Sequence, residues 1–322
     1  MNTPLLQADG LSVAFPVRGG VLRREVGRLR AVERVSLAVG AGEVLGIVGE
    51  SGCGKTTLGR ALVGLVEPDA GTLRIGGRDV ATLSSDERRS LARDVQMVFQ
   101  DPFASLNPRK RVRQILALPF EAHGLPAGAE REARIRELVE LVGLAPEHLE
   151  RWPHELSGGQ RQRVGIARAL ALEPRVVVLD EPLSALDTAI QSQVLNLLVD
   201  LQDRLGLGYV FISHDLSVVE YLSDSVAVMY LGRIVESAPA AVLFASPRHP
   251  YTQALLAAVP DPVPRRHRDS RPLEGDVPSP LHRPPGCSFH TRCPLAQARC
   301  RESAPELRAI GDGPQLAACH LL

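Results

Sequence analysis

The sequence predicts an α/β fold in which buried strands end at a phosphate-binding site. Gly49–Thr57 (GESGCGKTT) fits the phosphate-loop pattern G-x-x-x-x-G-K-S/T, and it stands between the apolar run Val44–Val48 and a helical pattern beginning at Leu58. Two more apolar runs, Val176–Leu179 and Tyr209–Ile212, are typical of buried parallel strands, and polar residues follow each of them. Ligands of open α/β sheets bind at the carboxyl ends of strands, so these polar residues should face the phosphate loop.

Composition narrows the class of protein. The 322 residues are 44% hydrophobic, enough for a large core, and 37 Lys and Arg balance 37 Asp and Glu. This balance gives no general attraction to nucleic acid. No apolar run approaches the roughly 18 residues of a membrane helix, and the first ten residues lack the pattern of a secretory signal. We therefore expect a soluble or peripheral protein of the cytosol.

The first part of the chain is rich in strand patterns. Leu11–Phe15 and Val35–Val39 alternate between apolar and polar residues, and Gly71–Gly77 contains a third short strand pattern. The basic, glycine-containing stretch Arg18–Arg30 between the first two is interpreted as a solvated loop. The nucleotide site should lie at the edge of this strand-rich region.

The middle of the chain changes to helical patterns. Ser84–Leu91 opens with the S-x-x-E spacing of a capping box, and Val95–Gln100 looks like a buried strand with a polar end. Residues 101–108 contain two prolines and predict a loop, after which Arg113–Leu149 is helical with one apolar face. These patterns predict a mostly helical subdomain at about 101–165.

The phosphate loop has the residues that bind a nucleotide. Its glycines let the backbone turn its N–H groups toward phosphate oxygens, and the helix that follows adds about half a positive charge. Lys55 can reach the outer phosphates, and the Thr56 hydroxyl can ligate magnesium. Cys53, flanked by glycines, would stand beside the bound phosphates, so we expect maleimide to modify it and the nucleotide to protect it.

Polar residues at other element ends suggest the rest of the site. Asp180 and Glu181 follow a buried strand, where one can hold magnesium through water and the other can polarise an attacking water. His214 follows another strand and could reach a terminal phosphate. Ser157 and Gln160 have the S-x-x-Q spacing of a helix start, which predicts a second anion site without a lysine.

The order of these motifs resembles the nucleotide-binding domain of ATP-binding-cassette (ABC) proteins over about residues 8–240. The resemblance implies a P-loop NTPase cassette with a RecA-like core, an antiparallel β subdomain and a helical subdomain. In that family, two cassettes pack head to tail around two ATP molecules. The motifs that carry the resemblance are the phosphate loop, Gln100, LSGGQ at 156–160, VVVLDEP at 176–182, SALD at 184–187 and SHD at 213–215.

The resemblance also implies residue roles. Glu181 would be the general base, Gln100 would sense magnesium and the attacking water, and His214 would contact the γ-phosphate. Thr56, Gln100 and Asp180 would form the magnesium site. Asp187 would lie at the interface between the two cassettes. Phe15 would stack on adenine, although it could equally fill core. ATP would contact Gly49, Glu50, Ser51, Gly52, Cys53, Gly54, Lys55, Thr56 and Thr57, and from the second cassette Ser157, Gly158, Gly159 and Gln160.

Two further stretches, Gln100–Pro108 and His249–Thr252, look like those of the ATPase subunits of bacterial oligopeptide and dipeptide import permeases. That resemblance implies peptide import at the cytoplasmic face of the cell membrane, as a peripheral subunit. The partners would be a second ATPase (identical or related), two transmembrane permease subunits contacting residues 101–120, and an extracytoplasmic solute-binding protein. The cassette would span 8–258, and a Pro-rich linker with a C-terminal extension would span 259–322.

Other functions remain open at this point. Relatives of peptide importers include importers of nickel and other small solutes. A soluble ABC-type ATPase of DNA repair or translation is the main rival, although the chain lacks the coiled-coil insertions or second cassette usual there, and we expect no nucleic-acid partner. An exporter ATPase would not explain residues 249–252 or the cysteine tail.

The cysteine tail has the spacing C-x5-C-x6-C-x18-C, formed by Cys287, Cys293, Cys300 and Cys319. Structural zinc usually needs a closely spaced cysteine pair, and disulfides are unusual in the cytosol. Four thiolates at wider spacing suit a 4Fe–4S cluster, and the resemblance to peptide importers points the same way. Zinc and unmetallated thiols are the alternatives.

Overall fold

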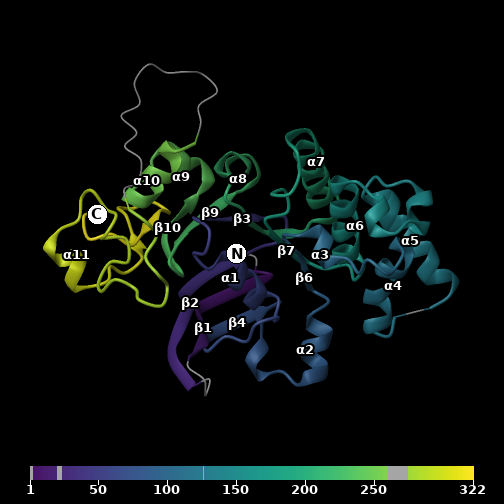
Figure 1. The fold of residues 1–322 in the computed structure, drawn as a ribbon, viewed down its shortest axis with the longest axis horizontal. Coiled ribbons are helices and arrows are strands. Elements are labelled where there is room, and N and C mark those ends of the chain that lie inside the picture. The colour runs from purple at the N-terminus through teal and green to yellow at the C-terminus, as the bar shows by residue number, and fades with distance from the viewer. Residues whose placement is uncertain (1–2, 20–23, 126, 260–274) are drawn as a thin grey trace.

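The computed structural model describes residues 3–19, 24–125, 127–259 and 275–322. It contains two β-sheets, one of four strands and one of eight, with helices on both sides of the larger sheet. Figure 1 shows helices α4 to α6 at one end of the long axis and the C-terminal extension, residues 275–322, at the other. The four-stranded sheet lies beside the middle of the larger one.

The smaller sheet is antiparallel, with the strand order β2-β1-β4-β5. The interpretation of Arg18–Arg30 as a loop was wrong, because this stretch is largely strand and Phe15 pairs with Leu29. The side chains of Arg28 and Arg30 are exposed, as expected for this basic stretch. The strands are β1 (Leu6–Gly19), β2 (Arg24–Val39), β4 (Ala70–Ile75) and β5 (Arg78–Asp79).

The larger sheet has the order β11-β12-β10-β9-β3-β8-β7-β6. Its five strands β9, β3, β8, β7 and β6 run parallel, so their carboxyl ends meet at one edge. Helices α1 (Lys55–Leu62), α7 (Thr188–Leu205) and α8 (Leu216–Leu222) connect or follow them. The strands are β3 (Val44–Val48), β6 (Val95–Val98), β7 (Val176–Asp180), β8 (Gly208–Ile212), β9 (Ser225–Tyr230) and β10 (Arg233–Pro239).

The middle of the chain is mostly helical, as predicted, but its helices are shorter and more numerous than the sequence patterns suggested. The Ser84 hydroxyl caps α2 (Ser85–Leu91) in the predicted capping box. The loop at 101–108 contains the short helix α3 (Pro102–Ser105), which begins after Asp101 because that carboxylate accepts from the first free N–H groups. The stretch from 113 to 149 divides into α4 (Val112–Ala122), α5 (Ala129–Leu141) and a 3₁₀ turn at Pro146–Glu150, and α6 (Gly158–Leu170) follows.

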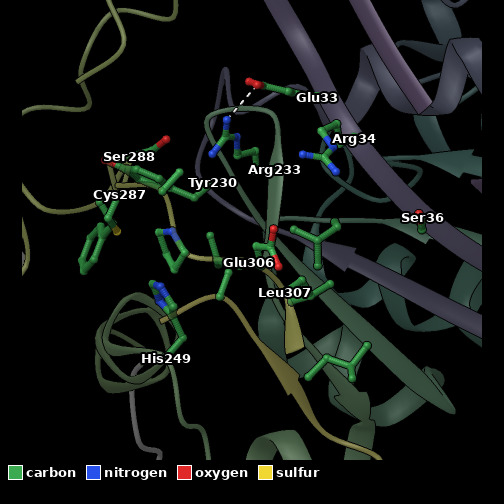
Figure 2. A pocket seen from close by; sticks show the side chains of 17 residues that line it. Glu33, Arg34, Ser36, Tyr230, Arg233, His249, Cys287, Ser288, Glu306 and Leu307 are labelled. Atoms are coloured by element: carbon green, nitrogen blue, oxygen red, sulfur yellow. Dashed lines mark hydrogen bonds and ion pairs between the residues drawn. The ribbon is translucent and has the colours of Figure 1, made fainter. Parts of the chain in front are cut away.

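The C-terminal extension adds strands to the larger sheet. β12 (Leu316–Ala317) pairs with β10 through Glu236 and Ala317, and β11 (Arg308–Ala309) pairs with β12. A cavity of about 550 Å³ lies between the extension, β2 and β10 (Figure 2). Much of the predicted Pro-rich linker, residues 260–274, lies outside the described residues. The remaining helices are α9 (Ala240–Ala245), α10 (Pro250–Ala257) and α11 (Ala298–Glu302).

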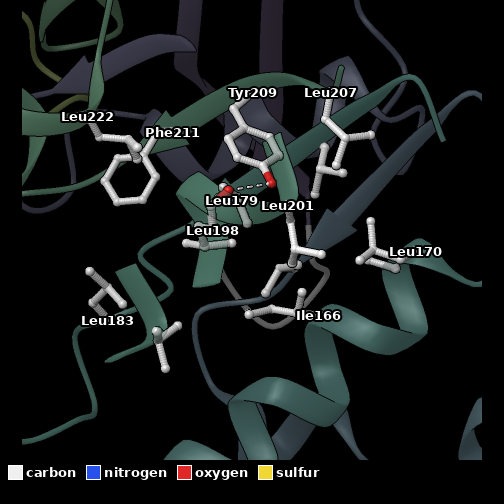
Figure 3. Packing of buried hydrophobic residues seen from close by; sticks show 14 of the residues in the cluster. Ile166, Leu170, Leu179, Leu183, Leu198, Leu201, Leu207, Tyr209, Phe211 and Leu222 are labelled. Carbon is white, nitrogen blue, oxygen red and sulfur yellow. Dashed lines mark hydrogen bonds between the residues drawn. The ribbon is translucent and has the colours of Figure 1, made fainter. Parts of the chain in front are cut away.

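The core lies on both faces of the larger sheet. Val177 and Leu179 belong to one hydrophobic cluster, whereas Val176 and Val178 belong to the other. This is why β7 is apolar at every position: its side chains alternate between two covered faces. Figure 3 shows side chains of α6 and α7 packed against β7 and β8, where the Tyr209 hydroxyl donates to a carbonyl of α7 at 3.1 Å.

No helix in the described part of the chain combines the length and apolar character needed to cross a bilayer.

Candidate nucleotide-binding site

The phosphate loop joins β3 to α1 at the edge where the parallel strands end. Gly54 has a φ of 107°, and a Cβ there would lie 2.1 Å from the Ala31 carbonyl oxygen, so only glycine fits. Lys55 is the first residue of α1, and its side chain is only 4% exposed. Its ammonium donates to the carbonyl oxygens of Gly49 at 2.7 Å and Glu50 at 3.2 Å. The lysine therefore lies inside the loop, where an anion would meet its charge.

Thr56 and Asp180 meet across the start of α1 and the end of β7. The Thr56 hydroxyl donates to Asp180 Oδ1 at 3.0 Å. Burial raises the pKa of Asp180, and the hydrogen bond from Thr56 opposes this rise. A hydroxyl and a carboxylate are ligand types that magnesium prefers, so this pair fits a magnesium site.

Glu181 stands at the centre of the cluster. Its φ of 44° is unusual for a residue other than glycine, and its N–H donates to the Ile212 carbonyl at 2.9 Å. Gln100 Nε2 donates to Glu181 Oε2 at 2.9 Å, and His214 Nδ1 lies 3.3 Å from the same oxygen. Lys55 Nζ lies 4.0 Å from the other carboxylate oxygen. Three side chains from separate motifs thus converge on the Glu181 carboxylate.

A cavity of about 460 Å³ opens onto this cluster. Phe15 lines it and is 38% exposed, which agrees with the predicted stacking position better than with a core position. Leu29 and Ala31 of β2 and Pro280 of the extension were missed by sequence reasoning, since no motif marks them. The lining residues are Phe15, Leu29, Ala31, Ser51, Gly52, Gly54, Lys55, Thr56, Thr57, Gln100, Glu181, His214 and Pro280.

The Ser157–Gln160 segment lies apart from this cavity. It begins α6 with the predicted capping box, in which Ser157 Oγ accepts from the Gln160 N–H at 3.2 Å. A Cβ on Gly159 would lie 2.5 Å from Ile190 Cγ2 of α7, so glycine permits this close packing. Asp187 is exposed and caps α7 by accepting from the Ile190 N–H at 3.0 Å. None of these residues lines the described cavity.

Cys53 differs from the sequence-based expectation. Its side chain is 2% exposed and belongs to a hydrophobic cluster, with Sγ 4.0 Å from Lys55 Nζ. Burial raises the pKa of the thiol, which keeps it protonated near neutral pH. The expectation of a reactive thiol beside the triphosphate is therefore wrong, because the Cys53 side chain is buried in the apolar core.

The C-terminal cysteines are neighbours without forming a metal site. Burial, and the proximity of the other thiols, raise the pKa of Cys287, Cys293 and Cys319. The Cys287 N–H donates to the Cys300 carbonyl at 2.8 Å. Yet no group of three or more His, Cys, Asp or Glu among the described residues is arranged to hold a metal ion. The structure therefore does not support the predicted 4Fe–4S cluster, because the described cysteines are not gathered into a ligand set.

Comparisons with known proteins agree with this geometry. Residues 32–184 match the family described as "ABC transporter". A probable peptide ABC transporter ATP-binding protein, y4tS of Sinorhizobium fredii, is 51% identical over 321 residues, covering 100% of this chain and 91% of that protein. The chain belongs to the ABC transporter family of ATP-binding proteins. Its ATP-binding cassette is an α/β fold of that family, and the activity of the family is ATP hydrolysis.

Other relatives cover the C-terminal extension as well. The chain is 49% identical over 322 residues to the oligopeptide transport ATP-binding protein AppF of Bacillus subtilis, covering 98% of this chain and 97% of that protein. Residues 235–300 match the family described as "Oligopeptide/dipeptide transporter, C-terminal region". Among solved structures, the dimeric cassette MJ0796 bound to ADP and Pi is 28% identical with a TM-score of 0.64, covering 73% of this chain and 98% of that chain.

Proposed function

We propose that this chain hydrolyses ATP to energise the import of peptides through a membrane ABC transporter. The observation that supports the proposal most is the C-terminal match, since residues 235–300 resemble the C-terminal region of oligopeptide and dipeptide transporters. Relatives that align over nearly the whole chain are named as peptide or oligopeptide transport ATP-binding proteins. The site would work at the cytoplasmic face of the membrane, as a peripheral subunit.

The cavity would hold ATP with its phosphates in the loop Gly49–Thr57 and its adenine against Phe15. The loop N–H groups and the start of α1 favour an anion, and Lys55 supplies a full charge. Thr56, Gln100 and Asp180, the last through water, would hold a magnesium ion, which would supply positive charge to the phosphates. The partly buried Thr56–Asp180 pair fits this role, because it presents oxygen ligands at the end of β7.

Hydrolysis would depend on Glu181. Its carboxylate would accept the proton of a water molecule while that water attacks the γ-phosphorus, the bond to the β–γ bridging oxygen breaks and ADP leaves. Gln100 donates to Glu181 and orients both the carboxylate and the water, and His214 contacts the γ-phosphate from the end of β8. Positioning and charge, rather than a covalent intermediate, would lower the barrier.

A second cassette would complete the site. The helix start at Ser157–Gln160 lies outside the cavity of its own chain. The capping box uses the N–H groups of Ser157 and Gln160, so Gly158 and Gly159 offer theirs as an anion site without a lysine. We propose that they close over the γ-phosphate of ATP bound to the partner cassette, with Asp187 at the seam between the two. Solved relatives include dimeric cassettes, which supports this arrangement. The partner cassette could be a copy of this chain or a relative.

A groove beside the helical subdomain would receive the permease. Its cavity of about 340 Å³ is lined mostly by apolar residues of β6, α4 and the segments that follow α1 and β6, including Phe99, Leu118 and the 58% exposed Leu65. An apolar groove between helices suits a short amphipathic helix. We propose that it binds a cytoplasmic helix of a permease subunit, near the predicted contact region 101–120, and that an extracytoplasmic binding protein delivers the peptide.

Co-purification tests the proposal. The wild-type chain should isolate two polytopic membrane proteins from solubilised membranes, and Leu65→Glu should lose them while still binding ATP. Leu205→Glu, at the 47% exposed end of α7, is the matched control and should retain them. Failure to recover membrane proteins, together with DNA binding that weakens steeply with salt, would favour a soluble ATPase instead.

A further inference from the structure

An arginine of the C-terminal extension reaches the phosphate loop. Arg292 Nη1 donates to Glu50 Oε2 at 2.6 Å, and Nη2 donates to Oε1 at 3.0 Å. The Arg292 side chain is 6% exposed and that of Glu50 is 26% exposed, so water screens the pair only in part. A two-pronged arginine–carboxylate contact of this kind fixes geometry as well as charge.

The extension holds Arg292 in place through a packed aromatic cluster. The Arg292 N–H donates to the Phe289 carbonyl at 3.0 Å. The Phe289 ring is buried, with its centroid 5.3 Å from those of Tyr230 and Tyr251. Figure 2 shows this part of the extension, at Cys287 and Ser288, beside Tyr230 and near His249. The packed aromatic cluster therefore holds the segment from which the Arg292 guanidinium reaches the phosphate loop.

Glu50 is fixed at its backbone as well. Its N–H donates to the Tyr251 hydroxyl at 2.9 Å, and its carbonyl accepts from Lys55 at 3.2 Å. Within Gly49–Thr57, Glu50 is the acidic residue of a loop that otherwise favours anions. A free carboxylate there would repel a triphosphate and would compete with it for Lys55 and the loop N–H groups. Arg292 offsets that charge, and Glu50 is not among the residues that line the cavity.

We propose that Arg292 is a positioning residue for ATP binding: by holding the Glu50 carboxylate, the C-terminal extension sets the affinity of the phosphate loop for ATP. The inference rests on ATP binding at that loop, as the proposed function requires. It gives the extension a role in the nucleotide cycle, 242 residues away in sequence from the loop that it contacts.

ATP titration of the purified full chain, by calorimetry with Mg–ATP, tests the inference. Arg292→Ala should weaken ATP binding about tenfold, the scale of a lost hydrogen-bonded charge pair. Arg292→Lys, which keeps the charge and loses the fork, should recover part of this loss. In a Glu50→Gln background the same Arg292→Ala change should alter the dissociation constant less than about twofold, since the carboxylate it controls is gone.

A control variant separates positioning from stability. Gln315 is a buried residue of the extension that donates to Glu236 at 2.8 Å, away from the loop. Gln315→Ala should lower the melting temperature and leave ATP affinity unchanged. The inference is overturned if Arg292→Ala binds ATP like wild type, or if Gln315→Ala weakens ATP binding as much as Arg292→Ala does. It is also overturned if Arg292→Ala raises the dissociation constant as much in the Glu50→Gln background as in the wild type.

A failure of the proposed function can be distinguished from a failure of this inference. Lys55→Ala removes the charge at the centre of the loop, and unchanged ATP binding in that variant would refute the nucleotide site itself. Lost binding in Lys55→Ala together with normal binding in Arg292→Ala would refute only the role of the extension.

Discussion

Replacing Glu181 with glutamine removes one charge from the site while keeping its shape. The amide oxygen can still accept from Gln100 Nε2, which now lies 2.9 Å from the carboxylate, so the local structure should persist. What disappears is the group that accepts a proton from water. General-base catalysis typically contributes about 10² to 10⁴ in rate, or roughly 3 to 5 kcal/mol of the barrier. Turnover should fall by that factor.

ATP binding should survive the same change. Lys55 loses only a carboxylate partner 4.0 Å away, and one fewer negative charge faces the phosphates. Glu181→Gln should therefore bind Mg–ATP at least as well as wild type and collect as an ATP-bound dimer. Phosphate release measures turnover, and sedimentation with ATP measures the dimer. Glu173→Gln is the control, because Glu173 also has a positive φ (54°) but its side chain is 75% exposed and lies outside the cavity lining. Wild-type turnover in Glu181→Gln would remove Glu181 from the base role.

Three other predictions follow from the site and its surroundings. Lys55→Ala should weaken ATP binding by roughly 10- to 100-fold, because a buried charged donor is lost, and unchanged affinity by nucleotide titration would contradict the phosphate-loop assignment. Cys53 should react slowly with maleimide in the folded chain and fast in urea, as mass spectrometry can follow; rapid labelling that ATP blocks would mean that the thiol faces the nucleotide. Burial lowers the pKa of His249 to about 4, so its neutral form stabilises the fold above pH 6.5 and this contribution is lost as pH falls from 6.5 toward 4. Urea unfolding should show a loss of roughly 2 to 3 kcal/mol between pH 7.5 and 4.5 that His249→Gln lacks, and equal acid sensitivity in the two proteins would argue against it.

The larger sheet and the polar cluster at its edge could be predicted from sequence. Strands such as Val176–Asp180 are apolar at every position because both faces are covered, and polar residues that follow them must meet at one edge. Gln100, Glu181 and His214 therefore converge as the motifs predict. These features are local, in that each depends on a short run of sequence and on where a strand ends.

The features that could not be predicted depend on contacts between segments that are distant in the sequence. β2 was not foreseen in the basic stretch, because Arg28 and Arg30 are exposed and the hairpin buries too little there to create an apolar alternation. The contact between Arg292 and Glu50 has no spacing or motif that could reveal it. Cys53 was misplaced for a related reason, since a loop's sequence does not say which of its side chains turn toward the core.

The central claim is that ATP hydrolysis in this cassette drives peptide import, and transport by the reconstituted complex tests it most directly. Proteoliposomes would contain this chain, its partner cassette and the permease subunits, with ATP on the cassette side and the binding protein with labelled peptide on the other. Wild-type complex should accumulate peptide, and an equally assembled complex carrying Lys55→Ala should not. Peptide uptake at the wild-type rate in the Lys55→Ala complex, or ATP turnover without any uptake in the wild-type complex, would contradict the account.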